Sequence, residues 1–143
     1  MTPISNHALS KFTDLGILFL RAAFGLRLIY GTIDNVLSYD RMLEFRDFLE
    51  HHGFPIPLAA AFVSVILQFT AGISWIIGFQ VRVFAFLMFI NFIIAIIGVH
   101  IGDAYPNTAP AIHLLVVALF LFFNGGGKWS VDEFFKIRKV PGG

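Results

Sequence analysis

Three long stretches of the chain contain no aspartate, glutamate, lysine or arginine: residues 51–81, 83–102 and 104–127. A helix needs about 20 apolar residues to cross the hydrocarbon core of a bilayer. Each stretch therefore has room for one membrane-spanning helix. We expect these spans at about residues 57–78, 83–101 and 109–124.

The composition points the same way. Hydrophobic residues make up 57% of the chain and charged residues only 13%, about half of the roughly 25% typical of soluble domains. These values exclude a disordered chain and leave too little polar surface for a water-soluble enzyme. The formal net charge of +1 gives no electrostatic basis for binding nucleic acid.

A fourth apolar stretch, residues 15–33, carries the two arginines Arg21 and Arg27. An arginine at the centre of a membrane-spanning helix costs about 3 kcal/mol on the insertion scale. These two side chains must therefore face protein, reach toward the interface or line a polar cavity. Gly25 and Gly31, on the same stretch, allow a neighbouring helix to approach closely.

The predicted fold is an all-α membrane protein, an antiparallel four-transmembrane-helix bundle that forms one membrane domain over residues 1–143. Helices are required because every backbone polar group in lipid must be paired internally. Six basic residues fall on one side of this bundle: Lys11, Arg82, Lys128, Lys136, Arg138 and Lys139. Only Arg41 and Arg46 fall on the other side, so the positive-inside rule places both termini in the cytoplasm.

The long first connection predicts an outer amphipathic helix at about residues 39–52. Ser38 can cap its start, and Met42, Phe45 and Leu49 share one face. We expect this helix to lie on the outer membrane surface. Two interpretations stay open: a cover packed over the bundle, and a lid or partner-docking surface.

The C-terminal tail, residues 125–143, is basic. Three glycines end the last span, and Ser130 and Glu133 have the spacing of a capping box. A short helix with aromatic and basic residues follows, which predicts an interfacial anchor on anionic lipid.

Polar residues within the spans gather toward the outer side. At a rise of about 1.5 Å per residue, Gln68 and Asn91 lie near the midplane. The outer half would hold Arg27, Tyr30, Asp34, His100 and His113. We therefore predict a polar pocket that opens outward and has Gln68 and Asn91 at its floor.

Purely structural interpretations of the same residues stay open. Arg27 and Asp34 can form a salt link along one helix face. Gln68 and Asn91 can be interhelical hydrogen bonds, worth about 1 kcal/mol each.

The sequence gives little support for a metal or haem. The chain has no cysteine, which excludes thiolate ligands and cysteine-bound iron–sulfur clusters. His100 and His113 are weak candidate metal ligands, because His100 faces away from the Asn91 side of a regular helix unless that helix ends early. No Ser–His–Asp set or carboxylate pair shares a membrane face, so catalytic residues stay unknown.

Several loose motifs follow one another from about residue 15 to residue 133. They are Arg21-x3-Gly25 with Gly31 and Asp34-Asn35, then Gly53-Phe54-Pro55, then Gln68-x3-Gly72-x5-Gly78-x3-Arg82, and finally the segment 125–132. In this order they resemble the DoxX family of membrane proteins. The chain departs from the family pattern at Asn35, where lysine is frequent, at Gln68, where glutamate is frequent, and at Arg27, which is an additional charge.

The resemblance implies a multi-pass protein of a bacterial-type inner (cell) membrane. It also implies a link to quinone-coupled redox chemistry. Some members are subunits of a thiosulfate:quinone oxidoreductase, and others resemble partners in membrane-associated redox complexes. Whether this chain is itself an enzyme stays open.

Our leading hypothesis is a subunit or accessory of a quinone-linked redox system that binds an amphipathic ligand. Arg27 and His113 would bond ligand carbonyls, Gln68 and Asn91 would position the ligand, and Tyr30 and Trp75 would pack against its ring. Asp34 completes the ligand-binding candidates. The polar and glycine residues expected to be structural are Arg21, Gly25, Gly31 and Gly72. A redox partner subunit or a homo-oligomer would accompany this role.

The alternative is a non-catalytic membrane scaffold or assembly factor that recruits partners through the outer helix and the basic tail. A small-solute carrier is a weaker third choice, because the spans lack paired glycine- or proline-broken helices.

Overall fold

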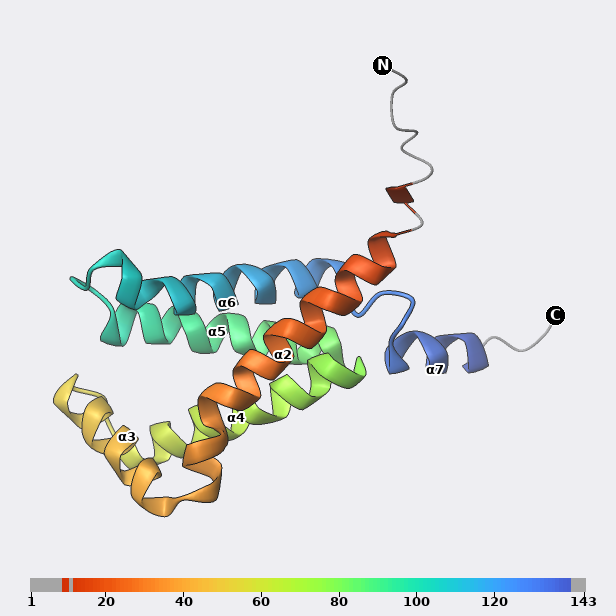
Figure 1. Cartoon of the computed structure of the whole chain (residues 1–143). Coiled ribbons are helices and arrows are strands. Elements are labelled where there is room, and N and C mark those ends of the chain that lie inside the picture. The colour runs from red at the N-terminus through yellow and green to blue at the C-terminus, as the bar shows by residue number, and fades with distance from the viewer. Residues whose placement is uncertain (1–8, 11, 140–143) are drawn as a thin grey trace.

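The computed structural model describes residues 9–10 and 12–139, and this part of the chain is helical, without strands. Its helices are α2 (Thr13–Leu37), α3 (Tyr39–His51), α4 (Pro57–Ile77), α5 (Val81–Val99), α6 (Tyr105–Asn124) and α7 (Val131–Lys139) (Figure 1). Four of them, α2, α4, α5 and α6, are long and apolar enough to cross a membrane. The predicted fold class is confirmed. Lys11 and residues 140–143 of the predicted tail lie outside the described residues.

Two spans are longer than the sequence predicted. Helix α2 runs to Leu37 rather than residue 33, because Asp34 and Asn35 are polar but are not helix breakers. Helix α6 begins at Tyr105 rather than residue 109. Pro106 lies in its first turn, where the missing N–H of proline has no helical partner to lose.

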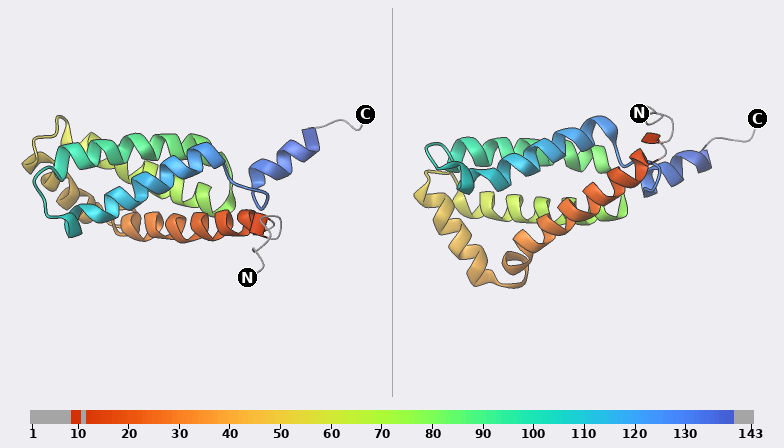
Figure 2. Two further views of the ribbon diagram at one scale, coloured as in Figure 1. Left: turned by 90° about the horizontal axis from the view of Figure 1, so that it is seen from above. Right: turned by 45° about the horizontal axis from the view of Figure 1, so that its top comes forward.

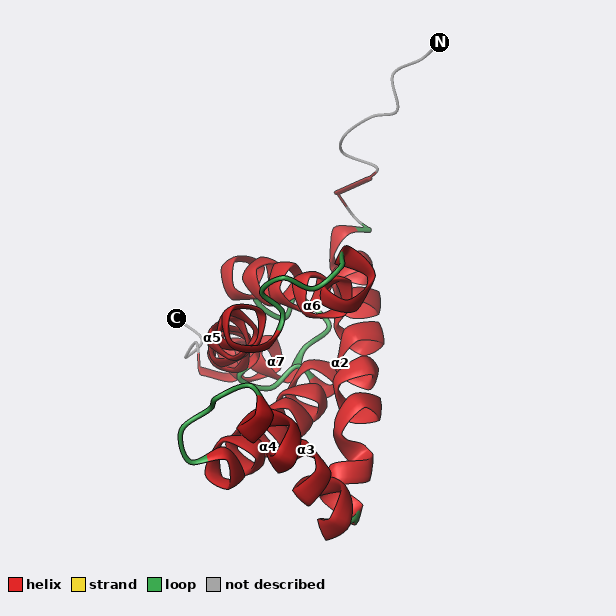
Figure 3. Cartoon of the chain, turned by 90° about the vertical axis from the view of Figure 1, so that its left-hand side faces the viewer, coloured by secondary structure: helices red, strands yellow, loops and turns green. Residues whose placement is uncertain are grey.

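The spanning helices form two antiparallel pairs, α2 with α4 and α5 with α6, and the pairs meet mainly through α4 and α5 (Figures 2 and 3). Glycines bring α2 and α4 together. A Cβ added to Gly25 would lie 2.8 Å from the carbonyl oxygen of Gly72, and one added to Gly72 would lie 2.7 Å from that of Gly25. The predicted close approach at Gly25 is therefore confirmed, and its partner is Gly72.

The bundle interior is apolar, and so is much of its outer surface. Trp75, Met88 and Leu121 are fully buried between the helices. Large apolar side chains also lie exposed on every spanning helix, among them Phe19, Val63, Ile97 and Phe123. A surface of this kind is solvated by lipid chains rather than by water.

Helix α3 packs onto the bundle. Ser38 caps it as predicted, since its Oγ accepts a hydrogen bond from the Arg41 N–H at 3.4 Å. Met42 and Leu49 are buried in one cluster with Ala61 and Val65 of α4. On the exposed face, Glu44 accepts a 2.8 Å hydrogen bond from Arg41 and so raises the pKa of Arg41 above its ordinary value.

The start of α2 and helix α7 lie at the same end of the bundle (Figures 1 and 2). The N–H of Lys128 donates to Oδ1 of Asp14 at 2.9 Å, which ties the two ends of the described chain together. We call this the terminal end, and the opposite end, which carries α3, the α3 end.

Candidate functional site

A cavity of about 420 Å³ lies between the two helix pairs toward the α3 end. We call it the inter-pair cavity. Residues of α2, α3, α4, α5 and α6 line it, and most of them are apolar. Its polar lining residues are Arg27, Ser64, Gln68, Asn91, His100 and Asn107.

A short hydrogen-bond chain joins α4 to α5 within this lining. The Oγ of Ser64 donates to Oδ1 of Asn91 at 3.0 Å, and Nε2 of Gln68 donates to Oγ of Ser64 at 3.0 Å. The bond to Asn91 is interhelical, as the structural interpretation of the sequence expected, whereas Gln68 bonds Ser64 within its own helix α4. Among the described residues, neither Nδ2 of Asn91 nor Oε1 of Gln68 has a partner, so the cavity offers a free amide NH2 group as donor and a free amide oxygen as acceptor.

Arg27 lines the cavity from α2 without a carboxylate partner. No ion pair joins it to Asp34 in the described part of the chain, so the salt link that the sequence left open as a structural interpretation is absent there. A Cβ added to Gly31 would lie 2.9 Å from Nη1 of Arg27. Because Gly31 has no side chain, the Arg27 guanidinium can extend along α2 toward the α3 end and remain available to a ligand.

His100 also reaches the cavity, because α5 ends one residue before it. Its Nδ1 lies 3.0 Å from Oδ2 of Asp103 in the connection between α5 and α6. A regular helix would have turned His100 away from Asn91, but the early end of α5 removes that constraint.

Four candidates lie elsewhere. Tyr30 is 79% exposed, Asp34 and His113 are also exposed, and Trp75 is fully buried in the core. None of the four lines the inter-pair cavity, so a ligand bound there would not contact them. His100 lines the cavity and His113 does not. The described residues contain no group of three or more histidine, aspartate or glutamate side chains arranged for a metal.

The DoxX family model matches residues 16–101. The chain belongs to the DoxX family. No curated protein and no solved structure gives a significant match. The matched region holds most of α2 and all of α3 to α5. It therefore includes Arg27 and the hydrogen bonds among Ser64, Gln68 and Asn91. Helices α6 and α7 follow it.

Helix α3 contributes to the cavity of this DoxX-family chain, which the sequence did not predict. Phe45, Phe48 and Leu49 line it, and Phe54 follows in the connection to α4. Phe45 and Leu49 had been placed on the apolar face of the predicted helix. The amphipathic pattern was therefore the available signal, but it did not reveal what that face would cover.

At the terminal end, Arg21 holds the C-terminal segment of this DoxX-family chain. Its side chain is 1% exposed, and it donates from Nη1 to the carbonyl oxygen of Gly126 at 2.7 Å and from Nη2 to that of Trp129 at 2.8 Å. A Cβ added to Gly78 or Gly126 would press on the same guanidinium. The predicted structural role of Arg21 fits this position.

Asp132 holds the same segment from the other side, a contact that the sequence did not predict. Its carboxylate accepts the N–H of Gln80 at 2.7 Å and of Val81 at 2.9 Å, at the start of α5. Gln80 has a φ of 52°, an unfavourable conformation for a residue other than glycine. Hydrogen bonds to a carboxylate at a helix start help to offset that cost.

Proposed function

We propose that this DoxX-family membrane protein binds a quinone or a similar amphipathic ligand in the inter-pair cavity, as a subunit or accessory of a quinone-linked redox system. The observation that carries the proposal is an apolar cavity of about 420 Å³ with a few polar groups among its lining residues. Small-molecule sites commonly have volumes of about 300–1,000 Å³ and combine apolar walls with a few well-placed polar groups.

The polar groups suit both forms of such a ligand. An oxidised quinone presents two carbonyl acceptors and needs donors, which the Arg27 guanidinium and Nδ2 of Asn91 supply. A reduced quinol presents hydroxyl donors and needs an acceptor, which Oε1 of Gln68 supplies. The phenylalanines of α3 would pack against the ring.

Electrons would reach the ligand from a partner subunit or cofactor. The chain has no cysteine to form a redox disulfide or to bind an iron–sulfur cluster. This DoxX-family chain would accordingly supply the membrane binding site, and its partner the electron donor or acceptor.

The test is equilibrium binding of a short-chain quinone to the purified protein in detergent. Arg27→Ala and Asn91→Ala should each weaken binding about tenfold, because each removes a hydrogen bond to a carbonyl in an apolar site. His113→Ala is the matched control and should bind like wild type. Negligible binding by wild type and all variants would discard the proposal.

We also propose that the terminal end faces the cytoplasm of a bacterial-type cell whose inner membrane holds the protein. The charge distribution supports this orientation. In the described chain the terminal end carries Arg82, Lys128, Lys136, Arg138 and Lys139. The α3 end carries Arg41 and Arg46 among six carboxylates: Asp34, Asp40, Glu44, Asp47, Glu50 and Asp103.

The scaffold alternative draws no support from the apolar face of α3. Met42 and Leu49 are buried against α4 within the protein itself. Replacing them would therefore disturb the bundle before it disturbed a partner. A docking surface on α3 would have to use its exposed aromatic residues Tyr39 and Phe48 instead.

A further inference from the structure

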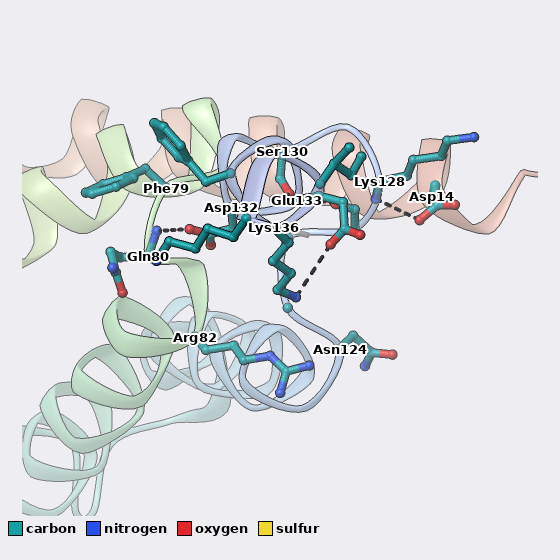
Figure 4. A pocket seen from close by; sticks show the side chains of 16 residues that line it. Asp14, Phe79, Gln80, Arg82, Asn124, Lys128, Ser130, Asp132, Glu133 and Lys136 are labelled. Atoms are coloured by element: carbon teal, nitrogen blue, oxygen red, sulfur yellow. Dashed lines mark hydrogen bonds and ion pairs between the residues drawn. The ribbon is translucent and has the colours of Figure 1, made fainter. Parts of the chain in front are cut away.

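A second cavity, of about 850 Å³, lies at the terminal end (Figure 4). We call it the terminal cavity. It is an open cavity bordered by α7, by the loop that precedes α7, by Phe79 in the turn between α4 and α5, and by the helix ends at Arg82 and Asn124. It is separate from the inter-pair cavity and shares no lining residue with it.

The acidic residues of the terminal cavity are already occupied. Asp14 accepts the N–H of Lys128 at 2.9 Å, and Asp132 accepts the two N–H groups at the start of α5. Glu133 lies 3.5 Å from Nζ of Lys136 (Figure 4). The carboxylates therefore serve the fold and leave most of the cationic side chains around them unneutralised.

Three cationic side chains of the cavity have no carboxylate partner within the described residues: Arg82, Lys128 and Lys139. Arg82 is the best placed of them. A Cβ added to Gly125 would lie 2.9 Å from its Nε, so the guanidinium packs closely against the loop backbone. In Figure 4 the Arg82 side chain points toward Asn124, and the Lys136 amine points toward Arg82.

Three apolar side chains also line the terminal cavity and remain exposed: Phe79, Phe135 and Ile137. They lie where the spanning helices end, the level at which the headgroups meet the acyl chains. A guanidinium with nearby amines matches a phosphate group, and the apolar rim matches the chains attached to it.

We propose that the terminal cavity binds the phosphate of an anionic phospholipid headgroup, with Arg82 as its main contact and Lys136 beside it, because the exposed Lys136 amine lies 3.5 Å from Glu133 and points toward Arg82. The proposal assigns a specific lipid site, in addition to any general attraction of the basic tail to the membrane. It is independent of quinone binding at the other end of the bundle. Inorganic phosphate shares the charged group but lacks the apolar part.

The test is native mass spectrometry of the full-length protein in detergent, with phosphatidylglycerol and phosphatidylcholine offered together. Wild type should retain phosphatidylglycerol in preference, and Arg82→Gln should lower its retention about tenfold. Arg138→Gln is the matched control. Like Arg82→Gln, it removes one positive charge, here from α7. Arg138 does not line the cavity and packs over the ring of Phe134 instead. The retention of phosphatidylglycerol by Arg138→Gln should differ from that of wild type by less than about threefold.

Lys136→Gln provides a second variant, and it should also weaken retention, by about fivefold. Circular dichroism and melting curves of each variant establish that the fold is intact. An excess of inorganic phosphate should not displace the lipid. Equal losses in Arg82→Gln and Arg138→Gln, no preference over phosphatidylcholine, or full displacement by inorganic phosphate would each overturn the proposal.

Discussion

Nη1 of Arg21 donates a 2.7 Å hydrogen bond to the carbonyl oxygen of Gly126, which joins the first spanning helix to the loop that follows the last. The contact is buried, and a second bond from Nη2 to Trp129 accompanies it. Two protein carbonyl groups therefore partner Nη1 and Nη2 of the arginine that membrane insertion penalises, while its buried Nε has no partner within the described residues. Its role is to hold the C-terminal segment against the bundle.

Arg21→Met should destabilise the protein by about 3 kcal/mol, because two charge-assisted hydrogen bonds are lost and two carbonyl groups are left unpaired. It should also release the segment around Lys128, which trypsin would then cleave faster. Melting curves and limited proteolysis in detergent measure both effects. Arg27→Met, the control on the same helix, should leave cleavage at Lys128 unchanged. An unchanged cleavage rate in Arg21→Met would contradict the assigned role.

Gly72→Ala should separate α2 from α4 and lower stability by about 2 kcal/mol, since forced overpacking typically costs that much. The added Cβ would lie 2.7 Å from the carbonyl oxygen of Gly25, which is rigid backbone. Gly16→Ala is the control, because a Cβ there meets no other atom within 4 Å. It should be neutral or stabilise α2 by about 0.5 kcal/mol. Melting temperatures in one detergent compare the two, and equal effects would argue against close packing at Gly72.

Single cysteines can report the orientation, because the chain has none of its own. Lys139→Cys at the terminal end and Asp40→Cys at the start of α3 are both exposed positions. A membrane-impermeant thiol reagent added to intact spheroplasts should label Asp40→Cys only. Inverted membrane vesicles should give the opposite pattern. The proposed topology has an odd number of membrane crossings between these two positions, which puts them on opposite sides. Labelling of both positions from one side would contradict it.

The spanning helices could be predicted because a segment that crosses lipid must be long, apolar and internally hydrogen-bonded. A stretch without charge that is long enough to cross the membrane has to be a helix, and α4 and α5 lie within two residues of their predicted bounds. The pairing of α2 with α4 could not be predicted in the same way. It depends on Gly25 meeting Gly72 across a long separation in sequence.

The sequence predicted how deep in the membrane the candidate site residues lie, but not which side of the bundle each of them faces. Counting residues along a helix gives the height of a side chain, and Arg27, Gln68 and Asn91 do share one cavity. Which side of the bundle a residue faces depends on the neighbouring helices, and this separates Tyr30 and His113 from the cavity. Trp75 follows Gln68 on the same face of α4 but lies two turns deeper, in the core.

The contacts of Arg21 and Asp132 with distant backbone atoms carried no local signal at all. Each joins segments far apart in the sequence, through carbonyl or N–H groups that every residue possesses. The residue types therefore reveal a buried arginine or a capping carboxylate only after the fold brings their partners close.

The most direct test of the account is photo-crosslinking with a quinone that carries a photoreactive group, followed by peptide mapping of the labelled protein. The account predicts labels on the residues of α3 and α5 that line the inter-pair cavity: Phe45, Phe48, Leu49, Asn91, Phe92, Ile94 and Ala95. An excess of unmodified quinone should suppress them. Labels confined to the lipid-exposed residues Phe19 and Phe123, or labels that excess quinone does not reduce, would contradict it.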